Sequence, residues 1–503
     1  MLRLFTLSLL IVLTATACGD DFLDRTPING FTPNNFYENE LQITDAVNGV
    51  YPVLRGQFTG FRWQLGEFRS DNTTFDFNAG DRGGSALEEL DYFQAFSGNG
   101  AFASLWSSSY TGIARVNFLL AALPEADFVN EDNRAIREAE ARFLRAFFYY
   151  HLTLHLGDVP IVLEPLIEEA EAVALRRSPQ EDVYDQAIIP DLEFAIANLP
   201  EEYQENVYEI GRATADAARM LLAKAHFVRR DYADALPLLT EVIESGRYTL
   251  LADFREVFAP GDEPNDEIIW NLQFDATADQ GAGFMINWLP LNSTNEVSGD
   301  IFPGSRAGRN RPTCDLIRAY DPNDERFAAT IGIYLDEETG DTITYYPRKF
   351  IYPPIPQAGL DLDWPVFRYA DALLMRSEAL LETQGGIPDQ VFLDINQIRA
   401  RAKLGLIFPG NPNPELDVQT TEALTEALRR ERRLELAIES HRWYDLVRWG
   451  IAEETMIEHG LEQKAKQSFL NDFPDAYTDI PDLFAIPDGQ VQQYGYRQNP
   501  GWD

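Results

Sequence analysis

Hydrophobic and polar positions follow a helical period in several long blocks of the chain. The clearest block is residues 133–157, NRAIREAEARFLRAFFYYHLTLHLG, which opens with polar and charged residues and then becomes apolar on most faces. A polar start and a closing glycine are typical helix boundaries, so the block predicts a helix that ends at Gly157. A helix that is apolar on most sides packs against several neighbours, which predicts a place in the core.

Two further blocks have the pattern of helix pairs. Residues 214–246 predict two amphipathic helices joined at the short polar turn Arg230–Asp231, with alanines recurring where paired helices would touch. The block is close in length to the roughly 34-residue tetratricopeptide unit. A second pair is predicted over 367–386 and 388–405. Repeated pairs predict a mainly α fold in which tetratricopeptide-like pairs form a solenoid-like superhelical frame.

Two long regions of different character separate these blocks. Residues 56–104 and 247–365 are rich in Gly, Pro, Asn, Asp and aromatic residues, with short strand-like runs such as EIIWNLQF and DTITYYPRKFIY. Loops of that length are uncommon in compact proteins and are usually functional. We therefore predict a helical frame, with additional helices over 181–199 and 420–449, that carries long ligand-facing loops.

The N-terminal segment predicts export. MLRLFTLSLLIVL has one positive charge, Arg3, and is shorter than the roughly 20 apolar residues that a membrane-spanning helix needs. Small residues follow and lead directly to Cys18, as in a lipoprotein signal peptide of residues 1–17 whose cysteine becomes the acylated first residue. We expect Cys18 to be the lipid anchor. The alternative is a secreted protein cleaved after ATA at 15–17.

Composition narrows the choice of partners. The 503 residues include 41 Lys and Arg against 81 Asp and Glu, a net charge of −40. A surface this negative repels phosphate backbones, so nucleic acid is disfavoured. Such acidity suits either a high-salt habitat or an ordinary extracellular protein, and both remain open. With Cys18 acylated, Cys314 is the one thiol left, so we expect no intrachain disulfide.

Candidate catalytic and metal-binding residues are few. His151 and His155 have the spacing of two zinc ligands on a helix, but Leu152 stands where that motif needs a glutamate, which favours a core role. Glu431 and Glu435 have the residue types of an acid–base pair, yet four arginines flank them and favour ion pairing. We therefore predict a binding protein with no catalytic residue, metal or cofactor.

Aromatic residues crowd the two predicted loop regions. Aromatic rings stack on the apolar faces of sugars while neighbouring polar side chains bond to the hydroxyls, so this mixture favours a glycan site. The alternative for any one ring is that it pins a loop to the frame. Trp288 is the best single candidate because it stands in polar sequence, FMINWLPLNSTN. The predicted ligand-binding residues are Trp288, Asp71, Asn72, Phe75, Asp81, Arg82, Tyr92 and Asn292.

Several long motifs, in order, resemble the SusD/RagB family of Bacteroidetes outer-membrane lipoproteins. The resemblance covers essentially the whole chain. Its motifs are CGDDFLD at the expected mature start, EARFLRAFFYYHLTLHLGDVPIV, FRYADALLMRSEALLE followed by INQIRARAKLG, ALRRERRLELAIESHRWYDLVRWG, and the ending LFAIPDGQVQQYGYRQNPGW.

The resemblance implies one SusD-like domain over 18–503, with four tetratricopeptide-like helix pairs supporting variable loops. Asp20 and Asp21 resemble the family's acidic export signal, although Gly19 intervenes. Arg442 and its neighbours in ESHRWYD are family markers that we interpret as structural. The expected frame spans about 34–55, 105–246, 367–460 and the C-terminal signature 480–502, and the ligand-facing loops span about 56–104 and 247–365.

The resemblance further implies a cell-surface protein, anchored to the outer membrane by Cys18, that binds oligosaccharide without cleaving it. Its partner would be a SusC-like TonB-dependent transporter, for which it acts as the lid. We expect a neutral glycan, because an anionic one would face the negative surface. Two alternatives stay open: a peptide-capturing member of the same family, and a helical-repeat scaffold with no nutrient ligand. A glycoside hydrolase would need two carboxylates about 5 to 10 Å apart across a cleft.

Overall fold

The computed structural model describes most of the chain from residue 36 onward. The predicted signal peptide (1–17) and the predicted anchor Cys18 lie outside the described residues. The described residues are 36–75, 84–203, 209–261, 264–277, 280–291, 293, 297, 299, 307–336, 339–355 and 359–502.

Helices dominate the described residues. They are α2 (Glu40–Asn48), α3 (Tyr51–Gln57), α4 (Ser85–Asp91), α5 (Gly100–Ala122), α6 (Glu131–Leu156), α7 (Glu169–Ala174), α8 (Gln180–Val183), α9 (Ile189–Asn198), α10 (Ala215–Arg229), α11 (Tyr232–Glu244), α13 (Cys314–Ala319), α14 (Arg326–Thr330), α15 (Tyr369–Gln384), α16 (Asp389–Arg401), α17 (Thr421–Glu435), α18 (Arg442–Trp449), α19 (Ala452–Lys466) and α20 (Asp488–Tyr494). Three π-helical turns span Phe58–Arg62, Gln64–Phe68 and Tyr184–Ile188. Short 3-10 turns span Leu123–Glu125, Phe254–Phe258, Phe284–Trp288 and Ser468–Asp472.

The described strands form three small antiparallel pairs. β1 pairs with β3, β2 with β6, and β4 with β5. The strand-like runs of the sequence are thereby confirmed as β2 and β5. The strands are β1 (Thr73–Thr74), β2 (Ile268–Leu272), β3 (Arg311–Pro312), β4 (Ile331–Leu335), β5 (Thr342–Pro347) and β6 (Trp364–Arg368).

The central helix α6 shows why its sequence folds as it does. The side chain of Asn130 accepts a hydrogen bond from the backbone N–H of Asp132, which caps the first turn. The helix stops at Gly157, whose positive φ of 66° is a conformation that glycine adopts without strain. Most side chains from Ala139 to Leu156 are buried, so the predicted core position of this helix is confirmed.

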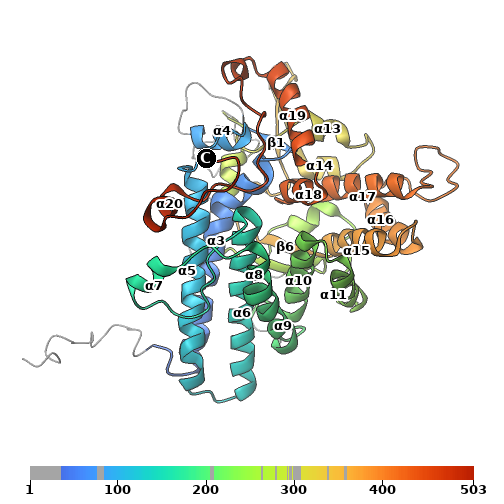
Figure 1. The fold of residues 1–503 in the computed structure, drawn as a ribbon. Coiled ribbons are helices and arrows are strands. Elements are labelled where there is room, and N and C mark those ends of the chain that lie inside the picture. The colour runs from blue at the N-terminus through green and yellow to red at the C-terminus, as the bar shows by residue number, and fades with distance from the viewer. Residues whose placement is uncertain are drawn as a thin grey trace, which may run out of the picture.

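The helical frame is built from helices that contact one another in sequence. Figure 1 shows the long helices α5 and α6 side by side, with α10, α11, α15 and α16 farther along the frame. Contacts run from α5 to α6, from α6 to α9, through α10 and α11 to α15, and from α15 to α16 and α17. The mainly α prediction is confirmed. The tetratricopeptide-like character of the pairs stays a prediction.

The C-terminal signature packs back onto the long helices. The ring of Phe102 in α5 lies 5.4 Å, centroid to centroid, from both Phe484 and Trp502. The side chain of Asn499 donates to the carbonyl oxygen of Leu156, the last residue of α6, at 2.9 Å. The C-terminal segment therefore packs against α5 and the end of α6.

The region predicted as a ligand-facing loop over 56–104 is instead largely helical and internal. It contains the end of α3, two π-helical turns, α4 and the start of α5. Every residue from 65 to 75 is buried. Most of the described aromatic residues of this region therefore form core, although Phe96 is exposed, and the prediction of one long ligand-facing loop is wrong for the described residues.

Candidate functional site

Trp288 is a core residue. It ends the 3-10 turn Phe284–Trp288 and is fully buried, with 0% of its surface exposed. Its ring centroid lies 5.6 Å from that of Trp63 and 5.9 Å from that of Phe350. A buried ring offers no face to a sugar, so the structure corrects the prediction of Trp288 as a stacking platform.

Phe75 and Tyr92 are also buried. Phe75 follows β1, and its ring stands edge-on to Phe68 at 6.3 Å. The Tyr92 hydroxyl donates to the backbone oxygen of Phe75 at 2.8 Å. Both side chains hold the segment after β1 in place. This structural role is the alternative that was considered for each ring, and it replaces the predicted ligand binding.

Asp71 and Asn72 serve ion pairs within the fold. Asp71 pairs with Arg442 at 2.7 Å and with Arg433 at 2.9 Å, and Arg433 also donates to the side-chain oxygen of Asn72 at 2.9 Å. Burial raises the pKa of Asp71, but the charges of Arg433 and Arg442 outweigh that effect and hold the pKa below its usual range. These two residues therefore fasten the region before β1 to α17 and α18. The structural role predicted for Arg442 agrees with these contacts.

The structure leaves three of the predicted ligand-binding residues untested. Asp81, Arg82 and Asn292 lie outside the described residues and remain predictions. The other five are buried because arginines far along the chain, or rings of distant segments, meet them. No local pattern around residues 71–75 carries a signal of those partners.

The arginine-rich stretch around Glu431 and Glu435 is a buried ion network. Glu435 pairs with Arg368 at 2.6 Å and with Arg401 at 2.5 Å. Glu431 pairs with Arg326 at 2.6 Å. The ion pairing predicted for both glutamates is confirmed, with partners that come from outside α17.

Electrostatics keeps the carboxylate of Glu435 charged. Burial raises the pKa of Glu435, but Arg401, Arg368 and Arg326 together hold it below its usual range. The neighbouring Glu439 accepts from Arg368 at 2.7 Å and from Lys349 at 2.8 Å. A general acid needs a carboxyl that keeps its proton near neutral pH. Glu435 has lost its proton there, so its role in this network is structural.

The histidines of α6 are core residues as well. His151 and His155 are 4% and 1% exposed. His155 is hydrogen-bonded to the backbone oxygen of His151 through Nδ1 and to the Tyr444 hydroxyl through Nε2. The predicted core role of this pair is confirmed.

One group of possible metal ligands occurs among the described residues. His226, Asp231 and Asp234 bring a ligand atom each to within 4.8 Å of one another at the turn between α10 and α11. Arg229 already lies 3.2 Å from the Asp231 carboxylate. The Arg229 side chain thus already pairs with one of the three possible ligands, and we assign no metal to this group.

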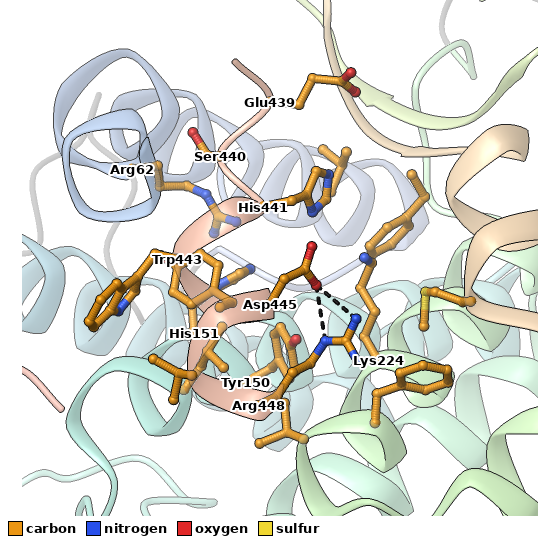
Figure 2. Close-up of a pocket in the computed structure, with 18 of the residues that line it drawn as sticks. Arg62, Tyr150, His151, Lys224, Glu439, Ser440, His441, Trp443, Asp445 and Arg448 are labelled. Atoms are coloured by element: carbon orange, nitrogen blue, oxygen red, sulfur yellow. Dashed lines mark hydrogen bonds and ion pairs between the residues drawn. The ribbon is translucent and has the colours of Figure 1, made fainter. Parts of the chain in front are cut away.

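A cavity of about 350 Å³, with both polar and apolar side chains in its wall, lies inside the frame. Figure 2 shows that α6 contributes Tyr150 and His151, that α18 contributes Trp443, Asp445 and Arg448, and that other side chains enter from neighbouring segments. Its volume falls within the range of roughly 300–1,000 Å³ that is typical of small-molecule sites. No pattern in the sequence indicated this cavity.

Most charges that line the cavity are already paired. Asp445 bridges Arg448 at 2.9 Å and Arg432 at 2.7 Å (Figure 2 draws the Arg448 contacts). Lys224 lies 2.6 Å from Asp371. Arg62, at the end of a π-helical turn, is paired with no carboxylate among the described residues.

Glu67 predicts a pH dependence of stability. Its carboxylate accepts from the backbone N–H groups of Ile438 at 2.9 Å and Ser440 at 2.8 Å, yet burial raises its pKa from 4.5 to about 7. A raised pKa stabilises the folded state fully below the unfolded value, and this stability is lost as the pH rises through about 7. Between about pH 5 and pH 8 this one group should lower the free energy of unfolding by about 2 kcal/mol.

Urea unfolding of the wild type and of Glu67→Gln at both pH values measures this effect. Glutamine stays neutral, so the wild type should lose about 2 kcal/mol more than the variant does across the interval. Any constant cost of the glutamine cancels in this difference. An equal loss in both proteins would show that Glu67 ionises normally.

Solved structures define the class of fold. A protein described as a laminarin binding SusD-like protein superimposes with a TM-score of 0.75 and 26% identity, over 93% of this chain and 100% of that one. A SusD homolog from Bacteroides thetaiotaomicron has a TM-score of 0.78 over 96% of this chain and 100% of its own, at 21% identity, and supports the fold. The architecture is that of SusD-like proteins.

Matches to family models show the family to which the chain belongs. The model of the SusD family matches residues 332–502, and a second model, described as starch-binding associating with outer membrane, matches residues 21–227. Together they cover more than half of the chain, which belongs to the SusD family. SusD-like protein P25 of Formosa agariphila is 28% identical over 488 residues, which cover 88% of each chain.

The described helices differ from membrane-spanning helices in length or in hydropathy. Among them, no helix is both long and apolar enough to cross a bilayer. The second family model nevertheless associates the family with the outer membrane.

Proposed function

We propose that the chain is a glycan-binding lipoprotein of the cell surface that delivers oligosaccharide to a SusC-like TonB-dependent transporter. The observation that carries this proposal is the similarity to the laminarin binding SusD-like protein over 93% of this chain and the whole of that one. The proposed anchor is Cys18, and the proposed domain is the single unit over 18–503. Both agree with a family that associates with the outer membrane.

The proposal assigns the chain binding and no catalysis. The carboxylate pair that sequence alone offers for acid–base chemistry, Glu431 and Glu435, is committed to Arg326, Arg368 and Arg401. A lid over a transporter needs a ligand that binds and leaves unchanged. The proposed contacts are the polar residues Asp81, Arg82 and Asn292, which can bond to sugar hydroxyls.

Calorimetric titration of the purified full-length protein in detergent tests this function. Laminarin oligosaccharides, other neutral oligosaccharides, acidic oligosaccharides and mixed peptides are titrated separately. We expect saturable heat with a neutral glycan, led by laminarin oligosaccharides, and none with peptides. Heat with peptides alone would make the chain a peptide-capturing member of the family. No heat with any ligand would favour a scaffold.

A further inference from the structure

The cavity of Figure 2 contains a half-buried positive charge, that of Arg62, with no carboxylate partner among the described residues. The Arg62 guanidinium rests on the ring of Phe58, 4.1 Å from its centroid, and 5.5 Å from that of Phe147. A cation–π contact recovers less than the desolvation of a charge costs. Burial lowers the pKa of Arg62 to about 10, which is still above neutral pH, so the side chain stays charged.

The two buried acids that line the cavity are already committed to other cations. Asp445 is shared by Arg432 and Arg448, and Glu439 by Arg368 and Lys349. Each of these acids lies within about 3 Å of two cations. The third lining acid, Asp482, is exposed, so Arg62 has no buried countercharge in the cavity.

Three buried polar atoms on the cavity wall have no hydrogen-bond partner among the described residues. They are Arg62 Nη1, His151 Nδ1 and Ser440 Oγ, and the side chains of His151 and Ser440 are 4% and 8% exposed. Figure 2 shows the Arg62 guanidinium pointing into the cavity. Buried polar groups are almost always satisfied, so three unsatisfied side-chain atoms in residues that line one cavity set this cavity apart.

The backbone around Arg62 also has an unusual conformation. It closes the π-helical turn Phe58–Arg62, and a second π-helical turn, Gln64–Phe68, follows after one residue. Such turns are rare and occur frequently at functional sites. The rim beyond it carries the exposed residues Arg230 and Asp482, which give access from solvent.

We propose that this cavity binds the carboxylate of a small organic acid, up to the size of one sugar acid, with Arg62 as its countercharge. A carboxylate matches the planar guanidinium and its parallel N–H groups. One unpaired cation suits a monoanion better than a dianion. His151 and Ser440 line the same cavity and carry the other unpaired polar atoms. The site goes beyond the proposed glycan function and does not depend on it.

Titration of sodium glucuronate into the full-length protein tests the site, with glucose as the neutral match and acetate as the bare carboxylate. Glucuronate should bind saturably and raise Tm, whereas glucose should do neither. Acetate should compete with glucuronate, because both present the same group. Absence of saturable glucuronate binding, equal binding of glucose, or tighter binding of inorganic phosphate would overturn the proposal.

Arg62→Met separates a ligand-binding arginine from a structural one. The variant should weaken glucuronate binding by at least about tenfold. It should leave the Tm of the ligand-free protein unchanged or raise it, because an unpaired buried charge is removed. Arg62→Lys should keep the charge and still weaken binding, since lysine lacks the planar fork.

The matched control is Arg176→Met, an exposed arginine after α7 that does not line the cavity, which should bind glucuronate as the wild type does. A marked loss of Tm in Arg62→Met without ligand would mean that the arginine supports the fold, and would overturn the assignment. Unchanged glucuronate affinity in that variant would overturn it as well.

Discussion

Replacing Trp288 by alanine should lower the free energy of unfolding by about 3–5 kcal/mol. The indole is fully buried between Trp63, Phe284, Phe350 and Trp364. Alanine would leave a cavity among four rings that cannot all move inward. The loss combines the transfer of the indole to water with the cost of that cavity.

Urea unfolding at neutral pH measures this loss. Phe96→Ala is the matched control, because Phe96 is 58% exposed and its truncation should cost less than about 1 kcal/mol. A Trp288→Ala protein as stable as the Phe96→Ala protein would mean that Trp288 has a surface role and that the core described around it is incorrect.

Glu435→Gln should cost about 3–5 kcal/mol as well. The substitution removes the one charge shared by Arg326, Arg368 and Arg401, whose side chains are almost completely buried. A buried ion pair gives little net stability, but removing one partner leaves uncompensated charges in a medium that solvates them poorly.

The control for this substitution lies on the same helix. Glu426 in α17 is 77% exposed, and its carboxylate lies 3.8 Å from Arg429. Glu426→Gln should change the free energy of unfolding by less than about 1 kcal/mol, as exposed ion pairs do. Equal effects of the two substitutions in urea unfolding would mean that the network is solvated and contributes little.

Local sequence was sufficient for the helical frame. The predicted helix 133–157 is α6 at Glu131–Leu156, and the predicted turn at Arg230–Asp231 separates α10 from α11. Apolar periodicity, polar caps and glycine stops all act within a few residues, so they can be recognised without knowledge of the fold. Most of the family motifs lie in α6, in α15 to α18 and in the C-terminal signature.

The predicted ligand residues failed because their partners lie far along the chain. Asp71 meets Arg442 across 371 positions, and Trp63 meets Trp288 across more than 200. Rings beside Asp and Asn suggested a sugar site, but the polar neighbours are satisfied by distant arginines and the rings fill the core. Composition alone cannot distinguish these two outcomes.

The cavity around Arg62 escaped prediction for a related reason. Its residue types, Arg62, His151 and Ser440, are ordinary in sequence, and they come from three separate segments. What sets Arg62 apart is the absence of a carboxylate near it among the described residues, and only the three-dimensional arrangement shows this.

Titration of laminarin oligosaccharide into the wild type, Trp288→Phe and Asn292→Ala tests glycan capture together with the core position of Trp288. We expect saturable heat in the wild type, the same affinity in Trp288→Phe, which keeps an aromatic core, and weakened binding in Asn292→Ala. Absence of heat with laminarin and every other glycan would contradict glycan capture. Binding lost in a folded Trp288→Phe protein but kept in Asn292→Ala would contradict the core position of Trp288.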